Sequence, residues 1–501
     1  TTGTDNVAIG EAALDAVTTG SNNTAVGDGA GGAVTTGASN TAIGADSLDA
    51  NSTGDSNTAI GKSALTANTT ADLNVAIGAA AMEANTTGAN NVAVGALALD
   101  ANTTAGSNVA VGYAALSANT TGTNNTSIGT GSLELNTTTS GNTAVGTNAL
   151  EANVAANNTA VGLNALVANT TGADNVAIGA DSLDANSTGS ENTAIGRNAL
   201  GANTTAGGNT AIGRNALLVN TTGAANIAIG ESALDANTTA SNNLAIGNAA
   251  LGANTTGTAN VAVGKSAGLA ITTGENNTAI GYQTLKSATT THGNTALGEN
   301  ALRDCTGTEN TAIGSSAMFD GTGGSENVAV GNDTLIVNAG DENVAVGGDS
   351  LKANTTGSEN IGIGYESLKA NTTASENVAV GMQALTTVTT SGNNTAVGRM
   401  ALKLNTAAGN TAVGHQTMLN NSTGTANTAV GKNALDSNTT ADNNTAVGYD
   451  ALQANSTGAS LTAVGKDALA ANTTGDNNIG MGRDAGQSIT TGSNNIAIGV
   501  E

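Results

Sequence analysis

The sequence predicts an all-β protein, a parallel β-solenoid of about thirty coils of 17, occasionally 16, residues. One motif recurs along the whole chain, aromatic side chains are nearly absent, and charge is excluded from fixed positions of the repeat. The 501 residues include 69 Gly, no Pro, no Trp, one Phe and four Tyr. Aromatic residues supply much of the buried area of an ordinary core, so this chain can build only a thin one. A hydrophobic fraction of 39 % still argues against disorder.

The repeat is the motif Asn-[Thr/Val]-Ala-[Ile/Val]-Gly, whose Asn is taken as position 1 of a unit N-T-A-V-G-x-x-A-L-x-A-N-T-T-G-x-x. Thirty copies occur; 25 of the 29 intervals are 17 residues long, and four are 16, ending at Gly162, Gly314, Gly347 and Gly414. No spacer interrupts them, so we predict that residues 1–501 form one continuous repeat array. The chain begins without Met inside a repeat and stops two residues after a motif, so we expect a fragment of a longer chain.

Each part of the unit has an expected structure. Positions 1 to 5 are short and β-branched at alternate residues, which predicts a strand. The invariant Gly at position 5 predicts a turn or a close approach that a Cβ would obstruct. Positions 8 to 14 predict a second extended segment, and positions 15 to 17, rich in Gly, Ser, Asn and Asp, predict a turn. The four short coils are expected to adjust a turn.

Charge is confined to a few positions of the unit. All 38 acidic residues occupy positions 6, 7, 10, 11 or the turn at 15 to 17. The basic residues at position 6 are Lys62, Arg197, Arg214, Lys265, Arg399, Lys432, Lys466 and Arg483. Those at position 10 are Lys286, Arg303, Lys352, Lys369 and Lys403. The four tyrosines share position 6 and are Tyr113, Tyr282, Tyr365 and Tyr449.

Both faces of the predicted strand therefore exclude charge, which is typical of strands covered on both sides. Position 3 is Ala except at Ser127, Gly362 and Gly480, as a narrow interior requires. Positions 2 and 4 would then form an outward apolar stripe ~140 Å long at ~4.8 Å per coil. Such a stripe needs cover, and a second copy of the chain is the expected partner. The reverse assignment, with positions 2 and 4 inside together with Leu at position 9, stays open.

Composition also weighs against several classes of function. A net charge of −25 repels nucleic acid and anionic membranes, and no apolar run approaches the ~20 residues of a membrane helix. We therefore predict neither nucleic-acid binding nor membrane insertion within this segment. His292 and His415 have no second His at ligand spacing, and carboxylates such as Asp349 and Asp467 are expected at surface turns. We predict no catalytic, cofactor or metal site, and no enzyme. Cys305 is expected to be a tolerated substitution at position 12.

Asn recurs at two positions. At position 1 it is replaced once, by Leu461; the alternatives are a binding ladder and a structural stack of amides bonded from coil to coil, and we favour the stack. The Asn-Thr-Thr string at positions 12 to 14 matches the N-glycosylation pattern. We interpret this match as a by-product of the repeat.

The string N-T-A-[I/V]-G-x-x-A-L-x-x-N-T-T-G, as in Asn57 to Gly61 with Ala64 and Leu65, resembles the head repeats of YadA-type trimeric autotransporter adhesins. It is also similar to 17-residue repeats of phage tail-fibre and surface proteins. The resemblance covers the whole chain and implies a left-handed β-roll, three parallel chains around a common axis, and positions 2 and 4 facing that axis. The adhesin coil is shorter, and these 501 residues include no stalk, anchor or chaperone domain, so host and receptor are not implied.

The expected function is thus a structural shaft or head of an extracellular trimeric fibre, on a cell surface or virion, that projects or mediates attachment. Its expected partners are two further copies of the chain and a host-surface or matrix receptor. Because no single coil stands out by clustered aromatics, histidines or charges, we expect a spacer with weak or no affinity of its own. The alternative is an ice-binding solenoid with a Thr-rich face at positions 2, 13 and 14.

Overall fold

The computed structural model describes residues 2–500, which form two compact units, the first ending at Thr256 and the second beginning at Gly257. The strands of the first unit are β1 (Val7–Ile9), β2 (Thr24–Val26), β3 (Thr41–Ile43), β4 (Thr58–Ile60), β5 (Val75–Ile77), β6 (Val92–Val94), β7 (Val109–Val111), β8 (Thr126–Ile128), β9 (Thr143–Val145), β10 (Thr159–Val161), β11 (Val176–Ile178), β12 (Thr193–Ile195), β13 (Thr210–Ile212), β14 (Ile227–Ile229) and β15 (Leu244–Ile246). Those of the second are β16 (Val261–Val263), β17 (Thr278–Ile280), β18 (Thr295–Leu297), β19 (Thr311–Ile313), β20 (Val328–Val330), β21 (Val344–Val346), β22 (Ile361–Ile363), β23 (Val378–Val380), β24 (Thr395–Val397), β25 (Thr411–Val413), β26 (Thr428–Val430), β27 (Thr445–Val447), β28 (Thr462–Val464), β29 (Ile479–Met481) and β30 (Ile496–Ile498).

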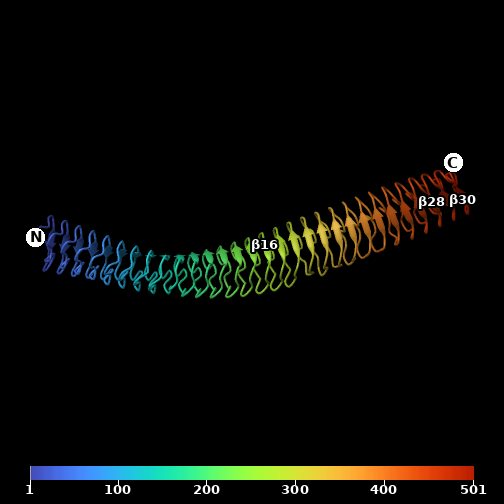
Figure 1. Cartoon of the computed structure of the whole chain (residues 1–501). Coiled ribbons are helices and arrows are strands. Elements are labelled where there is room, and N and C mark those ends of the chain that lie inside the picture. Colours follow the sequence, from blue (N-terminus) through green and yellow to red (C-terminus); the bar gives the residue numbers. More distant parts are fainter. Residues whose placement is uncertain (1, 501) are drawn as a thin grey trace. The chain divides into compact units, whose positions relative to one another are not determined.

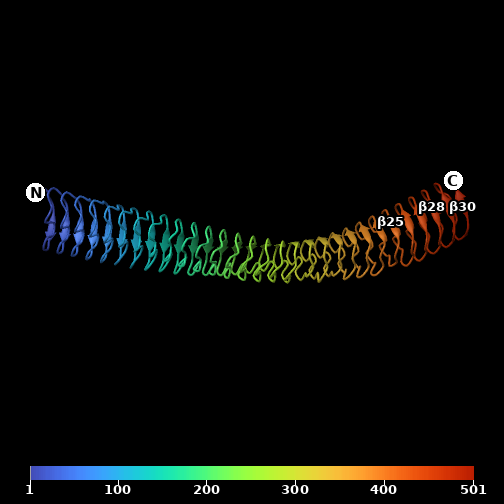
Figure 2. The same cartoon turned by 60° about the horizontal axis from the view of Figure 1, so that its bottom comes forward.

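Within each unit, successive strands lie side by side and point the same way (Figures 1 and 2). The pairing is parallel and in register, so that Ala25 of β2 faces Ala42 of β3 and Ala279 of β17 faces Ala296 of β18. No helix occurs among residues 2–500. The predicted all-β parallel β-solenoid with 17-residue spacing is therefore confirmed. The boundary between the units falls inside a repeat, and the prediction of one continuous array is left untested.

The invariant Gly at position 5 follows each strand and holds the coils at their spacing. Gly61 has φ +136°, and a Cβ on it would lie 2.4 Å from the carbonyl oxygen of Gly78 in the next coil. That obstacle is backbone and cannot rotate away. The close approach predicted at this position is confirmed.

The second extended segment predicted at positions 8 to 14 is wrong. In the described residues each coil has one strand, at positions 2 to 4, and position 6 onward is a series of turns and bends. Positions 7 and 9 adopt left-handed backbone, as at Ser63 (φ 57°) and Leu65 (φ 56°). In a strand, neighbouring side chains point to opposite faces. The left-handed residues break that alternation, so that Ala64 and Leu65 are both fully buried.

This compressed segment is still tied to its neighbours by backbone hydrogen bonds. Leu48 N–H donates to the carbonyl oxygen of Ala64 in the next coil at 2.9 Å, and Ala50 N–H donates to that of Thr66 at 3.0 Å. Alternate residues thus bond to the adjacent coil as they would in a sheet. The sequence pattern indicates this coil-to-coil pairing without revealing that the backbone is not extended.

The core is a narrow column filled by small side chains. Ala59 at position 3, Ala64 at position 8 and Leu65 at position 9 have no exposed surface, and neither do Asn57 and Asn68 at positions 1 and 12. Leu and Met are the largest fully buried side chains, at position 9. The thin core that the composition predicts is confirmed.

The short coils lose their residue in the turn after position 12. In an ordinary coil the Asn68 amide donates to the carbonyl of Ala71, three residues on. In the short coil that ends at Gly162, the amide of Asn153 donates instead to the carbonyl of Ala155, two residues on, at 2.7 Å. Strand register is kept, because Thr159 still pairs with Thr143. The turn adjustment predicted for these coils is confirmed.

Candidate functional surface

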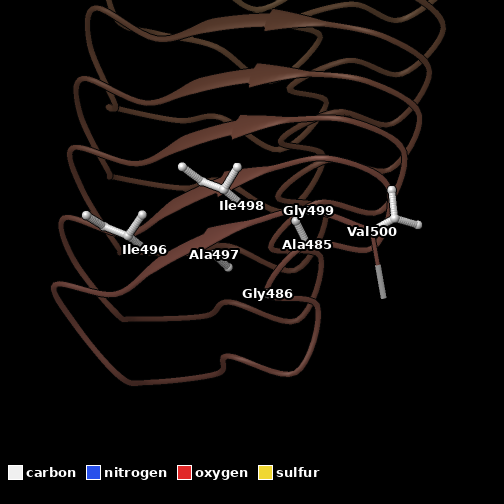
Figure 3. A pocket seen from close by; sticks show the side chains of 7 residues that line it. All are labelled: Ala485, Gly486, Ile496, Ala497, Ile498, Gly499 and Val500. Atoms are coloured by element: carbon white, nitrogen blue, oxygen red, sulfur yellow. The ribbon is translucent and has the colours of Figure 1, made fainter.

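The side chains at positions 2 and 4 form one face of the sheet in each unit, here called the outer face. In β30, Ile496 and Ile498 project to one side of the ribbon and Ala497 to the other (Figure 3). In the first unit Ile43 and Ile178 of the outer face remain 38 % and 39 % exposed, whereas the position-3 alanines from Ala25 onward are buried. Positions 2 and 4 therefore point away from the core, as expected. The reverse assignment is wrong, because Leu at position 9 packs inside with Ala at position 3.

The outer face has no charge to anchor water or a charged ligand. None of the thirty copies carries Asp, Glu, Lys or Arg at positions 1 to 5. The second unit repeats the exposure seen in the first, with Leu297 45 % and Ile363 39 % exposed. A row of half-exposed Val, Ile, Leu and Thr side chains is the surface expected of a protein contact rather than of a catalytic site.

The asparagines at position 1 form a ladder, and the structural interpretation of them is confirmed. Asn57 N–H donates to Asn40 Oδ1 at 2.9 Å, and Asn57 Nδ2 donates to the carbonyl oxygen of Ala71 at 2.8 Å. The next rung repeats this geometry, since Asn74 N–H donates to Asn57 Oδ1 at 3.0 Å. The buried amide of Asn57 thus satisfies backbone groups of two neighbouring coils, and it has no free group for a ligand.

A second ladder at position 12 was not predicted. Asn68 Nδ2 donates to Asn51 Oδ1 of the preceding coil at 2.9 Å, and both residues are fully buried. A buried amide that already bonds within the core cannot accept a glycan in the folded chain. The exclusion of charge from position 12 was the signal that could have revealed this ladder.

The remaining residues weighed as sites lie apart. Cys305 is buried at position 12, where burial raises the pKa of its thiol to about 11. Asp349 pairs with Lys352 at 2.7 Å, and Asp467 pairs with Lys466 at 2.9 Å. In residues 2–500, no three His, Cys, Asp or Glu side chains come together as metal ligands. The predictions of no metal, cofactor or catalytic site are left untested by such an absence.

His415 differs from the other residues weighed, because its Nε2 lies 3.2 Å from Nη1 of Arg399 in the preceding coil. Both occupy position 6. The count of charges and aromatics at each position of the unit does not show that position-6 side chains of successive coils meet. The order of those residues from coil to coil was the signal that could have shown it.

The hollows of the surface are shallow. One of about 290 Å³ lies where Gly201 leaves a gap between Asp184 and Leu218, all at position 10 of successive coils. Another of about 180 Å³ lies between Asp320 and Thr356. A third, of about 460 Å³, lies against β30 and is lined by Ile496, Ile498 and Val500 among others (Figure 3). None gathers the convergent polar groups that a small-molecule site needs.

Comparison with models of protein families finds no match to this chain, and comparison with curated proteins finds none either. Among the described residues there is no helix of the length and apolarity needed to cross a bilayer. The two surfaces that distinguish this chain are the outer face and the row of side chains at position 6.

Proposed function

We propose that this chain is a structural shaft or head of an extracellular trimeric fibre, on a cell surface or virion, which projects or mediates attachment. The observation that carries the proposal is the outer face: an uncharged, apolar and half-exposed row along each unit. A repeat under no constraint at these positions would accept Lys or Glu in some copies, as positions 6 and 10 do. Cover by further copies of the chain explains why both faces of the strand exclude charge.

Three copies in parallel register are the arrangement we propose. A parallel assembly places equivalent coils of each chain at the same level, so that apolar position-4 side chains meet one another along the whole contact. Association then removes the outer face from water, which stabilises the assembly by ~25 cal/mol for each Å² of apolar surface buried. The resemblance to trimeric adhesin repeats supports the number three and a left-handed coil.

The alternative, an ice-binding solenoid, has less support. The threonines at position 13 would have to present free hydroxyls in a regular array. Instead, Thr35 Oγ1 donates to the carbonyl oxygen of Ser52 at 2.9 Å, and Thr86 Oγ1 donates to that of Thr103 at 2.9 Å. These hydroxyls already join neighbouring coils. Position 2 varies irregularly between Thr, Val, Ile and Leu, which suits a packed contact better than a lattice.

Oligomeric state is the test of this proposal. Light scattering coupled to size-exclusion chromatography should return about three times the 47.7 kDa of one chain. A stable monomer that lowers the freezing point of water below its melting point would overturn the fibre proposal and favour the ice-binding alternative.

A further inference from the structure

In the second unit, position 6 is occupied by large or basic side chains in eight consecutive coils. We call this set the basic edge: Tyr365, Met382, Arg399, His415, Lys432, Tyr449, Lys466 and Arg483. Each is exposed except His415, which is partly exposed. The strands that precede them, β22 to β29, pair in parallel register. The eight side chains therefore form a row with one step of ~4.8 Å per coil.

Side chains of the basic edge contact one another from coil to coil. Arg399 and His415 meet at 3.2 Å. The ammonium groups of Lys432 and Lys466 lie 5.6 Å and 5.9 Å from the centre of the Tyr449 ring, which stands between them. Cations at this distance are attracted to an aromatic ring, so Tyr449 and its two lysines form one surface.

The centre of the edge is a basic island in an acidic chain. No Asp or Glu occurs between Glu376 and Asp436, although that interval holds Arg399, Lys403 and Lys432. Among the described residues, no carboxylate lies at ion-pair distance from these three cations. Their positive charges are therefore available to an external anion.

The end of the edge is partly neutralised. Lys466 Nζ lies 2.9 Å from Asp467 Oδ2, and Arg483 Nε lies 3.2 Å from Asp484 Oδ2. The strongest attraction for an anion is thus expected at Arg399 and Lys432, with the Tyr449 ring beside them. Position 6 accepts charge in many copies and lies outside the uncharged outer face, so association through that face does not require it.

We propose that the basic edge binds an acidic polysaccharide laid along the row of coils. A pyranose ring is about as long as one coil step, ~4.8 Å, and Arg399 and Lys432 stand two steps apart, with His415 between them. Carboxylate or sulfate groups on every second sugar can therefore meet the two cations. The exposed ring of Tyr449 offers an apolar face to a sugar ring. A row without a deep pocket suits a linear polymer, whose affinity comes from several weak contacts acting together.

Charge density favours a polysaccharide over a nucleic acid. Duplex DNA carries one negative charge per ~1.7 Å of axis, whereas the cations of the edge stand one or two coil steps apart. The chain as a whole carries −25, which repels the parts of any polyanion that extend beyond the basic edge.

The test is binding of the full chain to heparin, a sulfated polysaccharide, at low and at physiological salt. Arg399→Ala with Lys432→Ala should lower the affinity at least tenfold and make its salt dependence shallower, because fewer counterions are released. Lys432→Arg should keep the affinity. The matched control is Arg197→Ala with Arg214→Ala, which removes two position-6 cations from the first unit and should leave binding unchanged.

Tyr449 has a control of its own. Tyr449→Ala should weaken heparin binding severalfold, whereas Tyr113→Ala, at position 6 between Ala96 and Thr130, should have no effect. Far-ultraviolet circular dichroism should be the same for all these variants, which are at exposed positions. The proposal is overturned if the unaltered chain does not bind heparin at low salt, or if the control pair loses as much affinity. Tighter binding of a single-stranded oligonucleotide of equal length would overturn the choice of a polysaccharide.

Discussion

Asn57 and Asn40 are joined twice across neighbouring coils: the backbone N–H of Asn57 donates to Asn40 Oδ1 at 2.9 Å, and Asn57 Nδ2 reaches the same oxygen at 3.2 Å. Both residues are buried. One side-chain oxygen thus satisfies a backbone donor that lies out of reach of the strand pairing. The repeat of this arrangement explains why Asn, rather than an apolar residue, stands at the start of nearly every strand.

Asn57→Ala should destabilise the coils around it by about 2 kcal/mol or more. The change leaves Asn74 N–H without its partner, and a buried unsatisfied group costs about 1–3 kcal/mol. It also removes one of the two amide donors to the carbonyl of Ala71, which keeps Asn68 Nδ2. Hydrogen exchange of the amides in the adjacent coils would measure the loss. Asn248→Ala, at an exposed position 6, is the control and should change stability by less than ~0.5 kcal/mol. Equal effects of the two changes would mean that the ladder contributes nothing.

Gly61→Ala should prevent the coils from closing on one another. The new Cβ would lie 2.4 Å from the carbonyl oxygen of Gly78, and residue 61 has φ +136°, which a side chain disfavours. Because the obstacle is backbone, no side-chain movement can relieve the clash. We expect loss of the cooperative thermal transition or poor soluble expression. Gly201→Ala is the matched change: its Cβ would meet nothing closer than 3.4 Å, and stability should be unchanged or raised by up to ~1 kcal/mol. Wild-type stability of Gly61→Ala would contradict the close approach.

The fold could be predicted from sequence because its period is short and its constraints recur thirty times. Gly at position 5, Ala at position 3 and Asn at position 1 each have one physical explanation, and the structure agrees with all three. The second strand could not be excluded, because positive φ at Leu65 is uncommon for such a residue and leaves no mark in composition. That backbone is held by the burial of Leu65 together with Ala64.

The outer face could be predicted in part: charge exclusion marks both faces of the strand, and only the small Ala at position 3 favours positions 2 and 4 as the outward residues. The basic edge could not be found by the same counting. Tyr449 and its two lysines are 17 residues apart in the chain, and a tally by single coil separates them. Only stacking of the coils brings Lys432 and Lys466 to either side of the ring. In a periodic fold a surface site can be built from side chains of several stacked coils. Such a site leaves no single repeat unusual in sequence.

Acidification should stabilise the first unit around Asp184. Burial is the main cause that raises the pKa of this carboxyl above its ordinary value of 3.8, and the charge of Asp181 raises it further, against the lowering effect of backbone N–H groups. Because the pKa is higher in the folded than in the unfolded chain, folding gains stability as pH falls through the raised pKa, and the gain is complete below 3.8. Asp184→Asn should therefore raise the denaturation midpoint at pH 7 and have no such effect below pH ~3.8.

Glu366 in the second unit should show the opposite dependence. Hydrogen bonds from Lys369 and then Gln383 lower the pKa of its carboxyl, so its contribution is present at neutral pH and is lost as the carboxylate is protonated. Glu366→Gln should lower the midpoint at pH 7 and have no effect in acid. If Asp184→Asn and Glu366→Gln shifted the midpoint at pH 7 in the same direction, this account of the two carboxylates would be wrong.

Ile212→Asp and Ala211→Asp should fail in different ways, although the residues are adjacent. Ala211 is fully buried at position 3, so Asp there places an unpaired charge in the core, at a cost of about 3 kcal/mol or more. Ile212 points to the outer face, so Asp there should leave the coil folded and dissociate the proposed trimer. Circular dichroism and light scattering together separate the two outcomes. Arg214→Glu, at exposed position 6, is the control and should keep both fold and assembly; a trimer that survives Ile212→Asp would argue against contact through the outer face.

Deletion of residues 158–242 should shorten the fibre without changing its fold. The segment comprises five whole coils of the first unit, and its removal joins Asn157 to Asn243, so that position 17 is still followed by position 1. Because each coil bonds only to its neighbours, the new junction repeats the old one. Small-angle X-ray scattering should show a loss of ~24 Å in length at ~4.8 Å per coil, with an unchanged circular dichroism spectrum per residue.

The deletion leaves the basic edge intact, so heparin binding should be retained in the shortened chain. This result would separate the role of the coils as a spacer from the role of the basic edge as a binding surface. Unfolding of the shortened chain would show that its coils are not interchangeable, and loss of heparin binding alone would place the polysaccharide site in the deleted segment.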